Sequence, residues 1–277
     1  MEGFGRLKSI SSPLKLDWTT FLEKARTEGR HRPISAAAQL HQITRAIARC
    51  GYEQQRHAAC VRQVVLPRMR RHLHIINPAS QNIWQEALAA GFVRRQPKFG
   101  MLVKITGLDL HWHVKLAKAV RWTWQGAERH VEQVIRHLHR RFRGWNYILT
   151  VEFALHHVKQ EMLICFHAEG LVWGENLDLG AVKNKFPGGL YDSYGLDEKK
   201  VTNLSGVLRY MTKIDLRVHT YRNKLFRKSH HSARKITNKE LLDASYALRS
   251  LRWPDVTAAG GEGRKIVRAA LDHVGWE

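Results

Sequence analysis

The chain has 277 residues, of which 44% are hydrophobic and 25% charged, so it can bury one large core or two small ones. Lys and Arg number 46 against 24 acidic residues, and the formal net charge of +22 makes nucleic acid the expected partner. The three cysteines form no CxxC pair, so their spacing indicates neither a disulfide framework nor a cysteine zinc site. No stretch approaches the ~20 apolar residues of a membrane span or forms a secretory signal, so we expect a cytoplasmic location away from membranes.

The first third of the chain is predicted to be helical. Apolar residues recur there at spacings of three and four, and Asp17 is placed to cap the first helix. An arginine-rich joint within this region carries Arg68, Arg70 and Arg71. We therefore expect a basic helical domain over residues 1–95 that binds DNA or serves as an accessory domain. The alternative is a basic face that is merely solvated.

Strand-type sequence begins at Phe99. The pattern predicts a strand over 99–110, an amphipathic helix over 126–144 and two further strands over 145–155 and 161–174. The short connection between the last two makes them an antiparallel hairpin. Residues 186–200 are rich in Gly and Tyr and predict a loop.

The rest of the chain is predicted to be helical. We expect a helix flanked by cations within 203–228, then helices over 237–253 and 263–276 with a break at 254–263. The fold class is thus α+β, with a central antiparallel sheet of about five strands and flanking helices, preceded by the basic helical region. The expected domains after the first are a sheet domain over 96–225 and a basic helical C-terminal extension over 226–277.

The predicted hairpin gathers two acids and an imidazole. If the turn is centred on the peptide bond before Lys159, Glu152 lies opposite Cys165 and shares a face with His167 and Glu169. One imidazole and two carboxylates suit a divalent cation such as Mg²⁺ or Mn²⁺. A turn displaced by one residue would send Glu152 to the other face. A polar strand face that binds nothing is the other alternative.

A tyrosine and a lysine follow at helical spacing. Tyr210 and Lys213 are three residues apart and therefore share one side of a helix. A tyrosine hydroxyl becomes a useful nucleophile where a metal polarises a phosphodiester and a lysine steadies the charge. Taken alone, Tyr210 would be interpreted as a packing residue. Combined with the metal ligands, it suggests strand cleavage through a phosphotyrosine intermediate.

In the order of these motifs the chain resembles the HUH endonucleases, and among them the rolling-circle replication initiators of plasmids and single-stranded DNA phages. Such proteins run from a hydrophobic strand ending in Thr through a helix, an acid-bearing strand and a paired-ligand strand to a helix with Tyr and a later Lys. The corresponding stretches here are "MLVKIT" at 101–106, "ERHVEQVIRHLHRRF", "YILTVEF", "CFHAEGLVWG" and "VLRYMTK". The resemblance covers about residues 99–216.

The resemblance implies a nicking endonuclease domain over 96–225. His167, Glu169 and Glu152 would hold Mg²⁺ or Mn²⁺ while Tyr210 attacks single-stranded or hairpin DNA at a replication origin. Lys213 would steady the phosphate or the metal. The products would be a 5′-phosphotyrosine and a free 3′-hydroxyl, and the implied partners are a host polymerase and helicase. The alternatives are a single-tyrosine transposase or relaxase and a non-catalytic nucleic-acid-binding protein.

The family usually places two histidines around one hydrophobic residue, and this chain departs from that pattern. The corresponding residues read His167-Ala168-Glu169 or, in another register, Cys165-Phe166-His167. A carboxylate can replace an imidazole as a ligand, which favours the first. Literal His-x-His triplets occur at 72–74, 111–113 and 137–139, of which the second, with Asp109, His111 and His113, is the main rival site.

Further basic residues are predicted to hold the DNA strand. They lie in two clusters, and their members are Arg140, Arg141, Arg143, Arg222 and Lys224. Trp145 and Trp173 offer rings either for base stacking or for the core.

Overall fold

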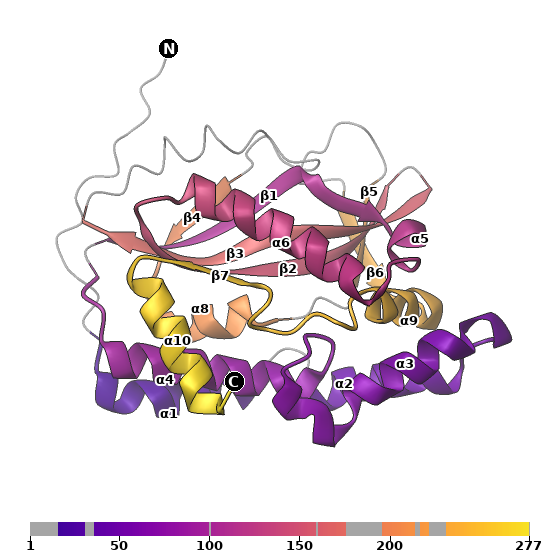
Figure 1. Cartoon of the computed structure of the whole chain (residues 1–277), viewed down its shortest axis with the longest axis horizontal. Helices are drawn as coiled ribbons and strands as arrows, with labels where there is room; N and C mark the ends of the chain where they lie inside the picture. The colour runs from indigo at the N-terminus through magenta and orange to yellow at the C-terminus, as the bar shows by residue number, and fades with distance from the viewer. Residues whose placement is uncertain are drawn as a thin grey trace, which may run out of the picture.

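The computed structural model describes residues 16–30, 36–99, 101–158, 160–175, 196–213, 217–221 and 231–276. Its fold class is α+β, as expected, and its sheet is mostly antiparallel (Figure 1). Within the described ranges the sheet has seven strands against the five or so expected, in the order β4-β1-β3-β2-β5-β6 with β7 beside β2. The strands are β1 (Met101–Lys115), β2 (Asn146–Val158), β3 (Glu161–Gly174), β4 (Leu196–Lys200), β5 (Arg217–Tyr221), β6 (His231–Lys235) and β7 (Thr257–Gly260).

Some helices begin where the sequence supplies a side-chain cap. The Asp17 carboxylate accepts a hydrogen bond from the Thr19 backbone N–H at 3.0 Å, as predicted, and Thr237 forms a capping box with Glu240. The helices are α1 (Trp18–Arg30), α2 (Ala36–Ala48), α3 (Gln55–Val65), α4 (Pro78–Arg95), α5 (Leu116–Ala119), α6 (Trp124–Arg141), α8 (Leu204–Met211), α9 (Asn238–Ala247) and α10 (Glu262–Val274), with 3₁₀ turns η1 (Tyr52–Gln54) and η2 (Pro67–His72). None of the helices in the described part of the chain is long and apolar enough to cross a membrane.

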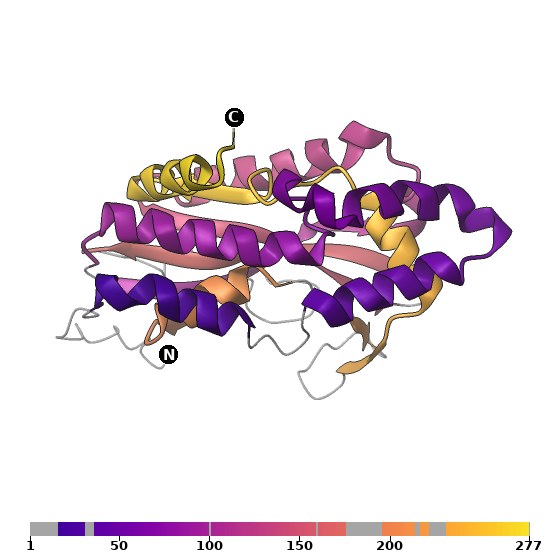
Figure 2. The same ribbon diagram turned by 90° about the horizontal axis from the view of Figure 1, so that it is seen from below.

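Helix α6 lies across one face of the sheet (Figure 1). Its His130 packs against Phe166 of β3 with ring centroids 4.7 Å apart, and its His139 Nδ1 lies 2.6 Å from the Tyr147 hydroxyl of β2. Because successive strand residues point to opposite faces, His167 points away from α6. Helix α8 packs on that other face against β2 and β3. Figure 2 shows α1 and α4 next to α8, and these helices are in mutual contact.

The core joins the helices to the sheet. Trp173 of β3 is fully buried and contacts Phe92 of α4 and Phe99, with ring centroids 6.2 and 5.8 Å apart. Burying each such side chain contributes about 1.5–3 kcal/mol. Most of the buried apolar residues among those described form one cluster that runs from Phe21 to Ala270. Trp173 is therefore a core residue and offers no ring for base stacking.

Several short strands were not predicted. Residues 196–200, expected to be part of a loop, form β4, and residues 217–221, expected as a helix flank, form β5. The expected break at 254–263 contains β7, so the region after residue 226 is not purely helical. Strands of four or five residues show too little periodicity to be read, and their pairing partners decide their conformation. The remainder of the predicted loop, 186–195, lies outside the described residues.

Strand β2 runs three residues further than predicted, and the turn of the hairpin is centred one residue later. Its last pair is Val158 with Glu161, and Gln160 in the turn has a φ of 67°. Glu152 therefore lies opposite His167 and not opposite Cys165. A turn centred one residue later displaces every pairing by two residues, which preserves the face to which each side chain points. The expectation that such a turn would send Glu152 to the other face was therefore wrong. The predicted sharing of one face by the acids and the imidazole is thus confirmed, although the predicted register was wrong.

Candidate metal centre

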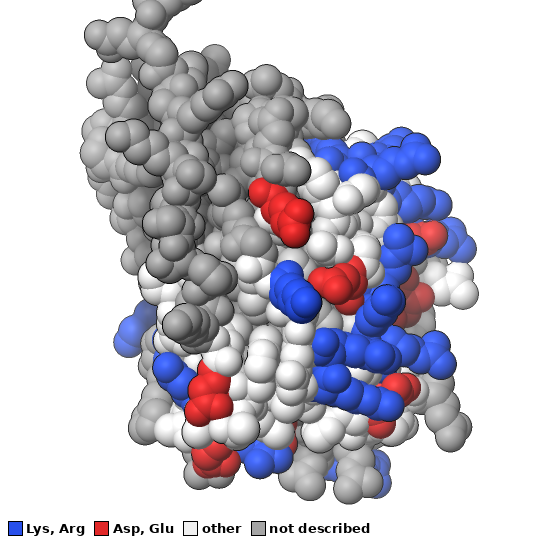
Figure 3. Space-filling model, turned by 90° about the vertical axis from the view of Figure 1, so that its left-hand side faces the viewer, with Lys and Arg blue, Asp and Glu red and all other residues white. Residues whose placement is uncertain are grey.

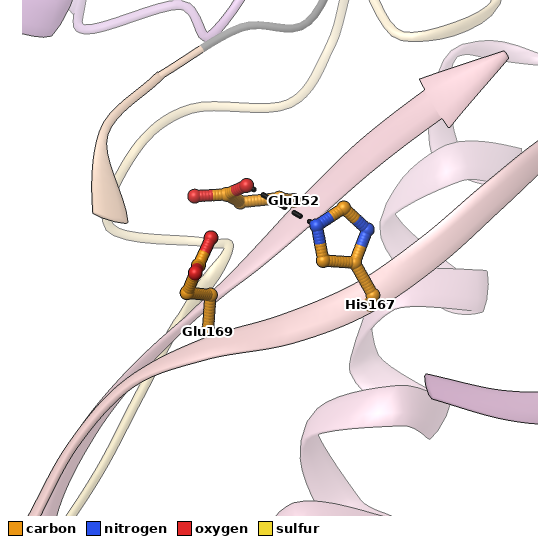
Figure 4. A group of neighbouring side chains, drawn as sticks. All are labelled: Glu152, His167 and Glu169. Carbon is orange, nitrogen blue, oxygen red and sulfur yellow. Dashed lines mark ion pairs between the residues drawn. The ribbon is translucent and has the colours of Figure 1, made fainter. Parts of the chain in front are cut away.

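Glu152, His167 and Glu169 form a compact cluster on the β2–β3 hairpin. Glu152 and His167 are direct cross-strand neighbours, and Glu169 follows on the same face of β3. One potential ligand atom from each of the three lies within 4.8 Å of the others, and His167 Nε2 is 3.2 Å from Glu152 Oε2 (Figure 4). One ring nitrogen with carboxylate oxygens suits Mg²⁺ or Mn²⁺. The cluster can therefore hold a metal ion.

The two carboxylates are almost fully buried. Their side chains are each 2% exposed, and the Oε1 atom of Glu152 makes no hydrogen bond within the described part of the chain. A buried acceptor without a partner costs about 1–3 kcal/mol, and more when it is charged. A cation bound between the carboxylates would satisfy this oxygen. The residues present thus fit a divalent metal ion.

Two lysines and a threonine surround the carboxylates. Lys104 Nζ of β1 lies 2.6 Å from Glu169 Oε1, to which the Thr106 hydroxyl donates at 3.0 Å. Lys213 Nζ lies 3.3 Å from Glu169 Oε2 and 3.7 Å from Glu152 Oε2. Both ammonium groups can therefore offset the buried negative charge.

The surroundings push the pKa values of the two acids apart. Burial and, after it, the nearby charge of Glu169 raise the pKa of Glu152 to about 7, against the lowering effects of the hydrogen bond with His167 and of the charge on Lys213. Burial acts in the same direction on Glu169, but Lys213, His167 and Lys104 together hold its pKa below the ordinary value. Burial opposes the charge of Lys213, yet the two carboxylates outweigh it and raise the pKa of its ammonium group.

Tyr210 lies beside this cluster and is accessible. It belongs to the last turn of α8, and 43% of it is exposed. Lys104 Nζ and Lys213 Nζ lie 3.4 and 3.3 Å from the centroid of its ring. Helix α8 is anchored by its buried apolar residues Leu204, Leu208 and Met211. Tyr210 therefore contacts the two lysines that pair with the carboxylate of Glu169.

Two residues of the cluster were missed from the sequence. Lys104 and Thr106 both point to the face of β1 that meets Glu169. The signal was available, because Lys104 stands between the apolar Val103 and Ile105 and shares the period-two face of Thr106. Lys213, expected within the helix, instead follows its end at Thr212.

The basic residues proposed to hold DNA are described only in part. Arg68 is exposed in η2, which also contains Arg70 and Arg71, whose side chains lie outside the described set. Arg140 and Arg143 are exposed at the end of α6, on the opposite face of the sheet, whereas Arg141 is half-buried near Trp112. On the face drawn in Figure 3, most of the described Lys and Arg residues lie toward the right-hand edge. Arg222 and Lys224 lie outside the described residues.

The literal His-x-His triplets give no comparable cluster among the side chains that are described. His137 and His139 are two apart on helix α6 and so do not share a side. His74 is buried, and burial lowers its pKa to about 4. The side chains of Asp109 and His111 lie outside the described ones, so the rival site on β1 stays a prediction.

Comparison of the chain with protein-family models, with curated proteins and with solved structures found no match. The function is therefore argued from the site alone. The site offers a mixed nitrogen and oxygen donor set, two ammonium groups and an exposed phenol, each within one contact of the next.

Proposed function

We propose that the protein is a metal-dependent DNA-nicking enzyme of the HUH type, acting as a rolling-circle replication initiator. One observation carries the proposal. The exposed ring of Tyr210 lies against two ammonium groups that themselves contact the buried carboxylates of a possible metal centre. A phenol held at the solvent side of such a centre is placed to meet a phosphodiester.

The order of the elements supports the proposal. Strand β1, helix α6, the hairpin of β2 and β3, and helix α8 follow one another in the order expected for the family. The formal net charge of +22 favours a polyanionic substrate such as single-stranded or hairpin DNA. A host polymerase and helicase would then act on the nicked product.

The proposed reaction is a transesterification. The Tyr210 oxygen forms a bond to phosphorus, the bond from phosphorus to the 3′-oxygen breaks, and the proton lost by the phenol is balanced by one gained by the 3′-oxygen. The products are a 5′-phosphotyrosine and a 3′-hydroxyl. A bound Mg²⁺ or Mn²⁺ would supply polarisation of the phosphate. His167, Glu169 and Glu152 would hold it, and Lys213 would stabilise negative charge on the phosphate.

The test is covalent capture of DNA. The protein is incubated with Mn²⁺ and labelled single-stranded oligonucleotides that tile the DNA flanking its gene, and adducts are resolved on a denaturing gel. We expect one or a few oligonucleotides to form an adduct that EDTA abolishes. Y210F should abolish the adduct and retain DNA binding, whereas Y52F, which alters a tyrosine that is 87% exposed, should retain both. Absence of an adduct with every oligonucleotide would refute the proposal.

A further inference from the structure

The charged groups of the centre are arranged by depth. The carboxylates of Glu152 and Glu169 are 2% exposed, the side chains of Lys104 and Lys213 are 20% and 30% exposed, and Tyr210 is the most exposed of the five. A ligand arriving from solvent therefore meets the phenol and the ammonium groups before the carboxylates. The outer part of the centre is suited to an anion and the inner part to a cation.

The balance of charge makes these two ligands interdependent. Two ammonium groups face two carboxylates, so the four groups are close to neutral when both acids are ionised. A divalent cation added between the carboxylates leaves two positive charges in excess in a half-buried site. Uncompensated charge in such a place is costly, and an anion next to the ammonium groups would reduce that cost.

The position of Lys104 links the two layers. Its Nζ atom contacts Glu169 Oε1 at 2.6 Å and the Tyr210 ring at 3.4 Å from the centroid. A cation that binds Glu169 competes with the ammonium group of Lys104 for that oxygen. The ammonium group is then available to an anion at the Tyr210 side, as is that of Lys213.

We propose that Lys104 and Lys213 form a binding site for a phosphodiester beside Tyr210, and that this site and the metal centre strengthen each other's binding. The identity of the anion as a phosphodiester rests on the proposed function, whereas the coupling rests on the charges alone. Lys104 lies within the first motif, to which the resemblance assigns no role for a lysine, and thereby becomes a substrate-binding residue.

The experiment measures Mn²⁺ affinity with and without a single phosphodiester. Free Mn²⁺ is followed by electron paramagnetic resonance while it is titrated into the full chain, alone or with the dinucleotide thymidylyl-(3′→5′)-thymidine. We expect the dinucleotide to tighten Mn²⁺ binding by at least about fivefold, the lower end of typical coupling between sites. The variant K104M should bind Mn²⁺ more tightly than the wild type without the dinucleotide, because a competing charge is removed, and should lose the coupling.

Two further variants complete the test. K104R keeps the positive charge and should retain the coupling, which guards against misreading a folding defect in K104M. K115M removes another lysine of β1, one whose ammonium group pairs with Glu161 and whose side chain is 60% exposed, and should behave as the wild type. Equal coupling in K104M and the wild type, or no effect of the dinucleotide on the wild type, would overturn the inference.

Failure of the inference and failure of the proposed function are distinguishable. If K104M forms the tyrosine adduct as fast as the wild type, the anion site is wrong and the nicking activity stands. If no oligonucleotide forms an adduct while the Mn²⁺ coupling depends on Lys104, the anion site stands and the nicking activity is wrong.

Discussion

Replacing the buried Glu152 by glutamine removes the charge of the side chain and keeps its shape. Burial, with the charge of Glu169 added, raises its pKa from the ordinary 4.5 to about 7. In that range the folded protein holds a proton that the unfolded chain has released, so the metal-free protein should lose stability as the pH rises from about 4.5 to about 7. The pKa of Glu169 lies below 4.5, so its titration does not enter this window.

The magnitude follows from the size of the pKa change. At about 1.4 kcal/mol for each pKa unit, the buried charge costs the folded state about 3 kcal/mol at pH 8. The neutral variant E152Q avoids this cost. In EDTA its free energy of unfolding should exceed that of the wild type by about 2–3 kcal/mol at pH 8, and by little at pH 5.

A bound metal should remove or reverse the difference in stability between the wild type and E152Q. A ligand at a hundred times its dissociation constant stabilises the folded state by about 2.7 kcal/mol. Glutamine is a weaker ligand than a carboxylate, so E152Q should gain much less from Mn²⁺ than the wild type. At pH 8 with Mn²⁺ the wild type should therefore be at least as stable as the variant.

Urea unfolding followed by circular dichroism measures these differences. It is run at pH 5 and pH 8, with EDTA or Mn²⁺, on the wild type, E152Q and the control E53Q, whose side chain is exposed on η1. The control should match the wild type throughout. If E152Q is less stable than the wild type at pH 8 in EDTA, or if the difference does not depend on pH, the electrostatic account of the buried pair is wrong.

Three further predictions concern the fold. Burial lowers the pKa of His74 to about 4, so the unfolded chain takes up a proton before the folded protein does as the pH falls below 6.5. The wild type should therefore be less stable at pH 5 than at pH 7, and H74Q should lose less stability over the same range. Urea unfolding at the two pH values measures the difference. A Cβ at Gly170 would collide with the backbone of β2, so G170A should lower the free energy of unfolding in urea by more than about 2 kcal/mol. The control G51A places its Cβ in open space and should change that free energy by less than about 0.5 kcal/mol. Loss of the α9 capping box in T237A should cost about 1 kcal/mol, and an unchanged melting temperature would contradict the role of that cap.

Periodicity in the sequence identified the long elements and the face of the hairpin that carries the site. Helix α6 and strands β2 and β3 are long enough for spacings of three and four, or of two, to be unambiguous. The register was missed because "HHVKQ", interpreted as the connection, contains three residues of β2, and only the turn at Gln160 sets the pairing. Glu152 nevertheless lies on the predicted face of the hairpin, because the strand pairing is displaced by an even number of residues.

Other parts of the site depend on contacts that no local pattern contains. Lys104 meets Glu169 because β1 pairs with β3, a pairing between segments far apart in the chain. Tyr210 reaches the same point only because α8 packs on the face opposite α6. Residue types and order predicted the candidate ligands, whereas the two ammonium groups against the phenol follow from the tertiary arrangement.

The late position of strand β7 in the chain affects how the protein folds while it is being synthesised. It pairs with Tyr147–Thr150 of β2, on the flank that β5 occupies further along at Leu155–Val158. On the ribosome the hairpin emerges well before residues 257–260. Until β7 is synthesised, this flank of β2 is an unpaired strand edge, with which other nascent chains can pair. A ribosome-bound chain that ends before β7 should therefore recruit chaperones more strongly than one that includes it.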